Sequence, residues 1–330
     1  MYERQAYQSN GSWVFFGGLP LGVVDGGKGL IEQHTAGALA AGTEIRYQAR
    51  LACLVRDEAG RVTGVRYTDD QGVAHEVTAG AVILAAGGFE ADPARRERHL
   101  GPGWSQALVR GTPSNTGEVL DLALAAGTAP HGDWNSCHSV QRDADAPPGG
   151  GERRLTNQLT RQSYPLGIVV NTRGRRFIDE GADFRNYTYA RYGREVLRQP
   201  GGLAFQIFDA KTRPLLRAEE YDSQPISAET AGNVRDLAAK LGADPGALAA
   251  TVAEFNASIT DAPFDPAVKD GRAARVQPPK SNWALAIDTP RITGTGWRAG
   301  SPSPSAAADR PAGPYSRPFR SAGPWPVRSR

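Results

Sequence analysis

The segment AVILAAGGF, Ala81 to Phe89, constrains the fold of this chain more than any other part of its sequence. A short run of uninterrupted apolar residues is typical of a strand buried on both faces of a parallel sheet. Gly87 and Gly88 follow the run, and glycine lets a backbone approach another molecule without a Cβ in the way. The segment therefore predicts a buried strand that ends at a bound molecule. The alternative is a plain strand-to-loop turn without a ligand.

The residues before this segment predict a helix and a meander. Gly26-Gly27-Lys28-Gly29 precedes a helical pattern that ends near Gly42, and an alternating strand is expected over 43–55. Turn signals at Asp57–Gly60 and Asp69–Gly72 separate three short strands. FAD-binding sheets use this organisation. The usual G-x-G-x-x-G motif is absent from the sequence, so the first glycine loop is either a cofactor contact or simply a loop before a helix.

The rest of the chain alternates between strands and helices. We expect a helix over 120–127, a strand, turn and second strand over 166–181, and a strand over 203–211. Two amphipathic helices follow over 233–259, with a break at Asp244-Pro245-Gly246. The predicted fold class is α/β, with a partial FAD/NAD(P)-binding, Rossmann-like domain that includes the meander over 1–140. An α+β capping domain for the substrate is expected over 141–290.

From Arg291 onward the composition changes. Arg, Pro, Ser and Gly dominate, and Asp309 is the single acidic residue. Such a segment buries too little apolar surface to offset its chain entropy. Residues 291–330 are therefore predicted to be a disordered tail. We also expect that the reading frame slips near Pro290 and that the chain begins downstream of a first strand.

Composition excludes several classes of function. The formal net charge of +3 is too small to indicate nucleic-acid binding, and the two cysteines form no zinc motif. No apolar stretch reaches the roughly 18 residues of a membrane span. The N-terminus lacks an apolar signal segment. These observations favour a cytoplasmic protein without a membrane span and without a metal.

Several motifs occur in a characteristic order. They are VDGGKGL (24–30), GRVTGV (60–65), AVILAAGGFE (81–90), NTGEVLDLALAAG (115–127), HGDWNSCHS (131–139) and GIVVNTRGRRFIDEGADFRNY (167–187). Together they make the chain similar to the flavoprotein family of fumarate reductase and succinate dehydrogenase. Within it, the closest likeness is to FAD-dependent tricarballylate dehydrogenases.

This resemblance implies FAD as the cofactor and assigns residues to its site. The implied cofactor-binding residues are Gly27, Lys28, Ala85, Ala86, Gly87, Gly88, Thr116, Gly117 and Glu118. The family usually has Asp-Gly where this chain has Glu118-Val119.

The resemblance also implies the catalytic residues. Arg185 would handle the proton at the reacting carbon, and His138 would hydrogen-bond a substrate carboxylate. Taken alone, Arg185 is more typical of a surface ion pair with Asp183 or Glu180, and a lone loop histidine is typically solvated.

Four further residues are implied to bind substrate: Asn157, Arg161, Tyr164 and Glu180. Fumarate reductases carry a glutamate where this chain has Thr160, which argues against fumarate reduction. An additional arginine suits a tricarboxylate, because a guanidinium binds carboxylates bidentately.

The predicted function is oxidation of a CH–CH bond in a small-molecule carboxylate, tricarballylate to cis-aconitate, with hydride transfer to flavin N5 and an unidentified electron acceptor. One alternative is a non-catalytic flavoprotein fragment. Another is an enzyme of the same family that resembles fumarate reductase or ketosteroid dehydrogenase.

Overall fold

The computed structural model describes residues 6–9, 12–15, 23–150, 159–222, 227–288 and 290–298. Its strands are β1 (Ala6–Ser9), β2 (Ser12–Phe15), β3 (Arg50–Arg56), β4 (Val62–Thr68), β5 (Ala74–Thr78), β6 (Arg142–Asp143), β7 (Ile168–Asn171), β8 (Leu203–Asp209), β9 (Ala228–Ala231) and β10 (Ile292–Arg298). Its α-helices are α1 (Gly26–Ala40), α2 (Pro93–Leu100), α3 (Glu118–Ala125), α4 (Arg185–Leu197), α5 (Ala218–Tyr221), α6 (Val234–Leu241) and α7 (Pro245–Ala257).

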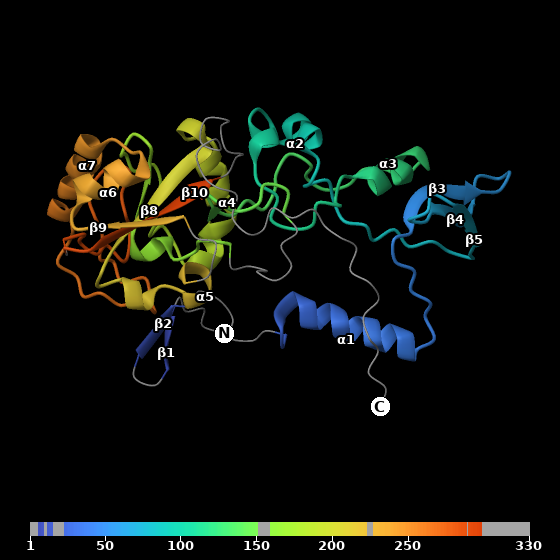
Figure 1. Ribbon diagram of the computed structural model, residues 1–330, viewed down its shortest axis with the longest axis horizontal. Coiled ribbons are helices and arrows are strands. Elements are labelled where there is room, and N and C mark those ends of the chain that lie inside the picture. The colour runs from blue at the N-terminus through green and yellow to red at the C-terminus, as the bar shows by residue number, and fades with distance from the viewer. Residues whose placement is uncertain are drawn as a thin grey trace.

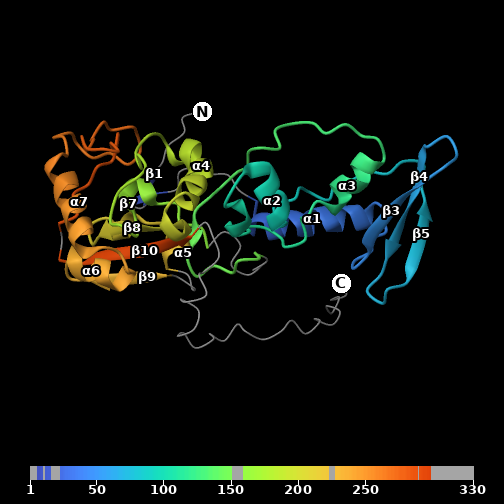
Figure 2. The ribbon, with the colours of Figure 1, turned by 90° about the horizontal axis from the view of Figure 1, so that it is seen from above.

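The strands form three antiparallel sheets. β1 and β2 make a hairpin, and β3, β4 and β5 make the meander that the turn signals predicted. The third sheet has the order β6-β10-β8-β7, and β9 also pairs with β10. The meander and this five-stranded sheet lie at opposite ends of the molecule in both ribbon views (Figures 1 and 2).

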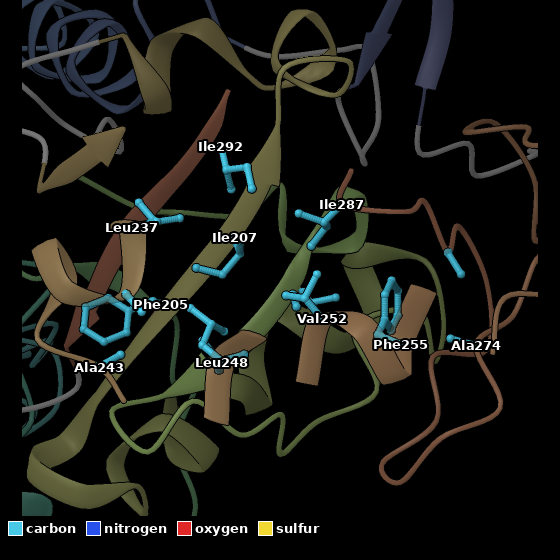
Figure 3. Close-up of a cluster of buried hydrophobic side chains, with 14 residues drawn as sticks. Phe205, Ile207, Leu237, Ala243, Leu248, Val252, Phe255, Ala274, Ile287 and Ile292 are labelled. Atoms are coloured by element: carbon cyan, nitrogen blue, oxygen red, sulfur yellow. The ribbon is translucent and has the colours of Figure 1, made fainter. Parts of the chain in front are cut away.

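The five-stranded sheet is buried on both faces. All four residues of β7 are buried, so its apolar run Ile168 to Val170 has no solvent side. Alternate residues of a strand point to opposite faces. One face meets α6 and α7 in the cluster of Figure 3, which includes Phe205, Ile207, Leu237, Leu248, Val252 and Phe255. The other face meets α4 through Tyr192 and Val196.

The helix boundaries follow from local capping. Gly42 has φ of 82° directly after the end of α1, as expected for a glycine that closes a helix. Gly242 closes α6 in the left-handed region, and the Asp244 side chain accepts a hydrogen bond from the Ala247 N–H at 2.9 Å at the start of α7. The predicted break between the two helices is therefore confirmed.

The predicted start of the tail at residue 291 is wrong. β10 pairs with β8 along all seven of its residues, and its other edge pairs with β9 and β6. Its sequence lacks apolar alternation, and Gly294 has no side chain because Leu241 of α6 packs directly over it, where a Cβ would lie 2.5 Å from the Leu241 Cδ1. The remaining part of the predicted tail, 299–330, lies outside the described residues.

The predicted strand over Ala81–Gly88 is also wrong. These residues belong to no helix or strand, no described strand pairs with them, and Ile83 is 90% exposed. An interior strand needs hydrogen-bonding neighbours, and the described chain places none beside this segment. For the same reason the strand expected from residue 43 begins only at Arg50, and the second strand of 166–181 is reduced to one bridge between Val170 and Arg176.

Helix α1 packs little against the rest of the described chain. Gly29 is its only buried residue, and Leu30, Ile31 and Leu39 are all exposed. Among the described residues, no helix combines the length and the apolar character that a membrane crossing requires.

Candidate functional site

A cavity of about 260 Å³ gathers most of the residues that the sequence assigned to the cofactor. Its lining includes Ala86, Gly87, Gly88, Thr116, Gly117 and Glu118, together with Arg50, Ser114 and neighbouring residues. They come from the extended segment after the meander, from the start of α3 and from the start of β3. We call it the glycine cavity.

Two glycines let the walls of the glycine cavity touch. Gly87 has φ of 76°, and a Cβ there would lie 2.7 Å from the Asn115 side-chain nitrogen. Gly117 has φ of 83°, and a Cβ there would lie 2.9 Å from the Phe89 Cβ. A hydrogen bond from the Ala91 N–H to the Asn115 carbonyl, 2.9 Å long, joins the two segments. Any larger residue at these positions would separate them.

An ion pair closes one side of the glycine cavity. The Arg50 guanidinium donates to both carboxylate oxygens of Glu118, over 2.6 Å and 3.2 Å. Glu118 is thus held by a protein partner at the start of α3. No motif marks Arg50, which opens β3, and only the fold brings it 68 positions along the chain to Glu118.

Gly27 and Lys28 lie apart from this group. Both are in the first turn of α1, which the ribbon shows well separated from α3 (Figure 1). Lys28 is exposed and forms an ion pair with Glu32 at 2.9 Å. Neither residue lines the glycine cavity.

A second, larger cavity of about 840 Å³ adjoins the first. Gly88 and Leu120 line both. Phe89 and Trp134 give it an aromatic wall, with ring centroids 5.8 Å apart. Other parts of its lining are cationic or titratable: Arg110, His131, His138 and Arg142. The two cavities together offer an elongated site with an apolar and a charged wall. We call the larger one the charged cavity.

The structure brings the two predicted catalytic residues to the same tyrosine. The His138 ring meets the Tyr189 ring edge-on, with centroids 4.9 Å apart. The Arg185 guanidinium carbon lies 5.3 Å from the centroid of the same ring. His138 lines the charged cavity, whereas Arg185 is not part of its lining.

Helix α4 fixes the position of His138. The Ser139 N–H donates to the Ala190 carbonyl at 2.7 Å, and the Gly193 N–H donates to the Ser139 carbonyl at 3.1 Å. A Cβ at Gly193 would lie 2.3 Å from the Ser139 hydroxyl oxygen, so the close approach requires glycine. Burial and the nearby Arg110 charge lower the pKa of His138 below its ordinary value.

Arg185 is a buried cation at the first position of α4. Its pKa is lowered by burial and by the charge of Arg217, and the Glu220 carboxylate opposes this shift. The two acids that are close to Arg185 in the sequence form ion pairs with other residues. Asp183 lies 3.1 Å from the Lys269 ammonium, and Glu180 pairs with Arg176.

The other implied substrate residues lie away from the cavities. Arg161 and Glu180 are fully buried in ion pairs with Asp143 and Arg176, and these side chains hold the fold together in this structure. Tyr164 is also buried, and its hydroxyl lies 2.5 Å from the Thr188 hydroxyl. Asn157 lies outside the described residues.

A carboxylate does lie next to Thr160, but it comes from another element. The Thr160 hydroxyl donates to Glu220 Oε1 at 3.3 Å, and the Gln162 N–H donates to Glu220 Oε2 at 2.8 Å. Glu220 also pairs with Arg217 at 2.9 Å. The sequence analysis missed Arg217 and Glu220, because they lie about sixty positions from Thr160 in a segment without a motif.

The fold is that of a mixed α/β protein with two adjoining cavities. A family model described as "FAD binding domain" matches residues 20–301. The chain therefore belongs to the FAD-binding domain family, and FAD is the cofactor of that family.

Known relatives are oxidoreductases. The chain is 27% identical over 250 residues to 4-oxocyclohexanecarboxylate 2-dehydrogenase of Sinomonas cyclohexanicum, covering 72% of this chain and 42% of that one. It is 27% identical over 242 residues to the cytochrome-type fumarate reductase of Shewanella frigidimarina, covering 73% and 40%.

Solved structures share the fold. The open conformation of a flavocytochrome c3 fumarate reductase matches with a TM-score of 0.62 at 20% identity, over 89% of this chain and 48% of that one. The 3-ketosteroid Δ1-dehydrogenase of Sterolibacterium denitrificans matches with a TM-score of 0.57 at 23% identity, over 80% and 50%. The chain spans half or less of the length of each of these relatives.

The residues of the glycine cavity fit one part of a dinucleotide cofactor. Gly87 and Gly117 let the two wall segments approach each other, and Thr116 supplies a polar group along them. These residues would hold part of FAD at the glycine cavity, with Gly88 at the junction to the charged cavity. When bound, FAD supplies a centre that exchanges a hydride with substrate carbon.

Proposed function

We propose that this protein acts as an FAD-dependent oxidoreductase on a CH–CH bond of a polycarboxylate, with tricarballylate oxidised to cis-aconitate as the specific reaction. The observation that carries the proposal is the pairing of His138 and Arg185 on Tyr189, beside a cavity continuous with the glycine cavity. Oxidation of such a substrate requires three things at one place: a group that takes the proton from carbon, a group that binds the carboxylate, and a site for the redox cofactor.

Arg185 is the proposed proton-handling group. An arginine side chain can accept a proton only when it is neutral, and the neutral form is costly in water. Burial and the Arg217 charge both disfavour the protonated form and lower the pKa of Arg185. The negative charge of Glu220, which also pairs with Arg217, has the opposite effect and raises the pKa of Arg185. Arg185 would take the proton from one substrate carbon, while the hydride leaves the neighbouring carbon.

His138 is the proposed ligand of a substrate carboxylate. It lines the charged cavity, and its edge contact with Tyr189 orients the ring. Hydrogen bonding to that carboxylate stabilises the negative charge that builds up on the adjacent carbon as the proton leaves.

A cyclic keto substrate is the second candidate. The aromatic wall of Phe89 and Trp134 suits a ring, and one relative is named for a cyclohexanecarboxylate. The remaining alternative, a fragment that binds no cofactor, predicts a colourless protein.

Two measurements test the proposal in order. The purified chain is mixed with FAD, desalted, and examined for the visible flavin absorption band. Retained flavin is expected, and a protein that stays colourless contradicts the proposal. The loaded protein is then given tricarballylate, succinate, 4-oxocyclohexanecarboxylate or a 3-ketosteroid with an artificial electron acceptor. Tricarballylate is expected to bleach the flavin band and to reduce the acceptor fastest. Faster turnover of either cyclic ketone would move the assignment to the second candidate.

A further inference from the structure

The charged cavity contains a buried arginine whose hydrogen bonding is incomplete. Arg142 lines this cavity and is 5% exposed. Its Nη1 donates to the Val109 carbonyl, but its Nε has no hydrogen-bond partner within the described structure. Buried donors are almost always paired, so this N–H at a cavity wall indicates an acceptor that is supplied by a ligand.

A second arginine is held beside it by the backbone. Arg110 follows Val109, whose carbonyl binds Arg142, and its exposed side chain lines the same cavity. The Val109 N–H donates to the Pro148 carbonyl at 3.0 Å. A Cβ at Gly150 would lie 2.8 Å from the Val109 carbonyl oxygen, so the 147–150 loop clamps this segment against the cavity. The position of Arg110 is therefore built into the fold.

The charges at this wall repel one another. Burial and the Arg110 charge lower the pKa of Arg142 to about 10, and the same two causes lower the pKa of His138. The Asp143 carboxylate opposes this shift at Arg142 and also pairs with Arg161. Glu90 and Asp133 line the cavity too, where Glu90 accepts from Asn115 and Asp133 accepts from Ser136. An anion bound here would relieve the repulsion.

We propose that Arg110 and Arg142, together with His138, form an anion subsite that binds one carboxylate of a di- or tricarboxylate ligand, and that Arg110 sets the preference for the additional carboxylate. Guanidinium groups suit this task because their planar donors match the two oxygens of a carboxylate. The inference rests on the proposed function for its ligand class and adds two residues that no motif marked.

Binding to the FAD-free chain tests the subsite without any need for catalysis. Isothermal titration with tricarballylate, succinate and butyrate compares ligands with three, two and one carboxylates. Wild type is expected to bind tricarballylate most tightly. Arg110→Gln is expected to weaken tricarballylate binding about 10- to 100-fold, the range for a lost charged hydrogen bond, and to reduce the preference over succinate.

The matched control is Arg61→Gln. Arg61 is an exposed arginine of the meander that pairs with Asp57, and its replacement removes the same charge far from the cavity. Its affinity for tricarballylate is expected to stay within about twofold of wild type. Arg142→Lys keeps the charge but removes the unpaired Nε–H, and it is expected to weaken binding. A thermal melt checks whether Arg142→Lys is folded. If it is unfolded, the result for Arg110→Gln alone tests the subsite.

Three results overturn the subsite. They are the absence of tricarballylate binding by wild type, equal binding by wild type and Arg110→Gln, and an equal loss in Arg61→Gln. The outcome is separable from that of the proposed function. Arg110-dependent binding without flavin bleaching keeps the subsite and removes the oxidation, whereas equal bleaching in wild type and Arg110→Gln keeps the oxidation and removes the subsite.

Discussion

Arg161 and Asp143 form an ion pair in which both side chains are completely shielded from solvent. The Arg161 Nε and Nη2 donate to the same carboxylate oxygen over 3.1 Å and 2.8 Å. This carboxylate also accepts hydrogen bonds from the Ser227 N–H and the Asp145 N–H. One side chain thereby joins β6 to the segments before β7 and before β9.

Removing the charge of Asp143 is expected to destabilise the fold strongly. In Asp143→Asn the Arg161 cation stays buried without its counter-charge, and such losses amount to about 3–5 kcal/mol. Urea denaturation followed by circular dichroism measures the free energy of unfolding. Glu195→Gln, which breaks the exposed Arg198–Glu195 pair, is the control and is expected to lose less than about 1 kcal/mol. Similar losses of unfolding free energy in both variants would show that the buried pair stabilises the fold no more than the exposed pair does.

The glycine cavity is expected to depend on Gly117. Gly117→Ala forces a Cβ against Phe89 in a backbone conformation that favours glycine, so it is expected to separate the cavity walls and to lower FAD retention at least about tenfold. Gly127→Ala is the matched control, because Gly127 also has positive φ but has open space around its Cβ position. Flavin absorbance after desalting measures retention. Equal retention by the two variants would contradict a cofactor role for this wall.

The proposed proton transfer predicts a change in turnover. Arg185→Lys is expected to lower kcat by about 100- to 10,000-fold while KM changes little, because the removed group acts on the transition state. Glu220→Gln is expected to shift the pH profile of kcat, since it removes the carboxylate that raises the pKa of Arg185. Steady-state kinetics with tricarballylate check both. A kcat for Arg185→Lys within about tenfold of wild type would assign the proton to another group.

Lys280 is expected to make stability depend on pH. It is fully buried, donates to the Gly167 carbonyl at 2.6 Å, and burial lowers its pKa from 10.5 to about 8. Between these values the unfolded chain binds more protons than the folded one, so the free energy of unfolding rises with pH through this window. The gain is about 3 kcal/mol.

Lys280→Met removes this contribution and serves as the reference. Buried tyrosines such as Tyr164 and Tyr221, whose pKa values are raised by burial, affect both proteins alike. The stability of wild type relative to Lys280→Met is therefore expected to rise by about 3 kcal/mol as the pH rises from about 8 to about 10.5. A difference that is constant across this window would mean that Lys280 titrates normally.

Local patterns predicted the elements that carry their own signal. The meander turns, the helices α1, α3, α6 and α7, and the interior strands β7 and β8 all lie where periodicity and turn residues placed them. The glycines at 87, 88 and 117 and His138 were predicted from the resemblance, because their residue types and order are recognisable without a partner, and they line the two cavities.

Other features depended on partners far along the chain. β10 is a strand because β8 flanks one edge, and β9 and β6 share the other, although its own residues show no alternation. Ala81–Gly88 has the pattern of a strand but no described neighbour to pair with. Hydrogen bonding between strands is non-local, so a segment's own pattern is insufficient to decide it.

The sequence by itself determined the family and the cofactor, and it predicted the glycine and histidine positions of the candidate site. The tertiary structure decided which charges face a cavity and which face each other. Arg161 and Arg142 are both buried arginines near β6, yet one pairs with Asp143 and the other lines the charged cavity. An arginine has the same local signal in either role. Its role follows from which carboxylates the fold brings within reach, because a charge is stabilised in the interior only where a counter-charge or a ligand lies.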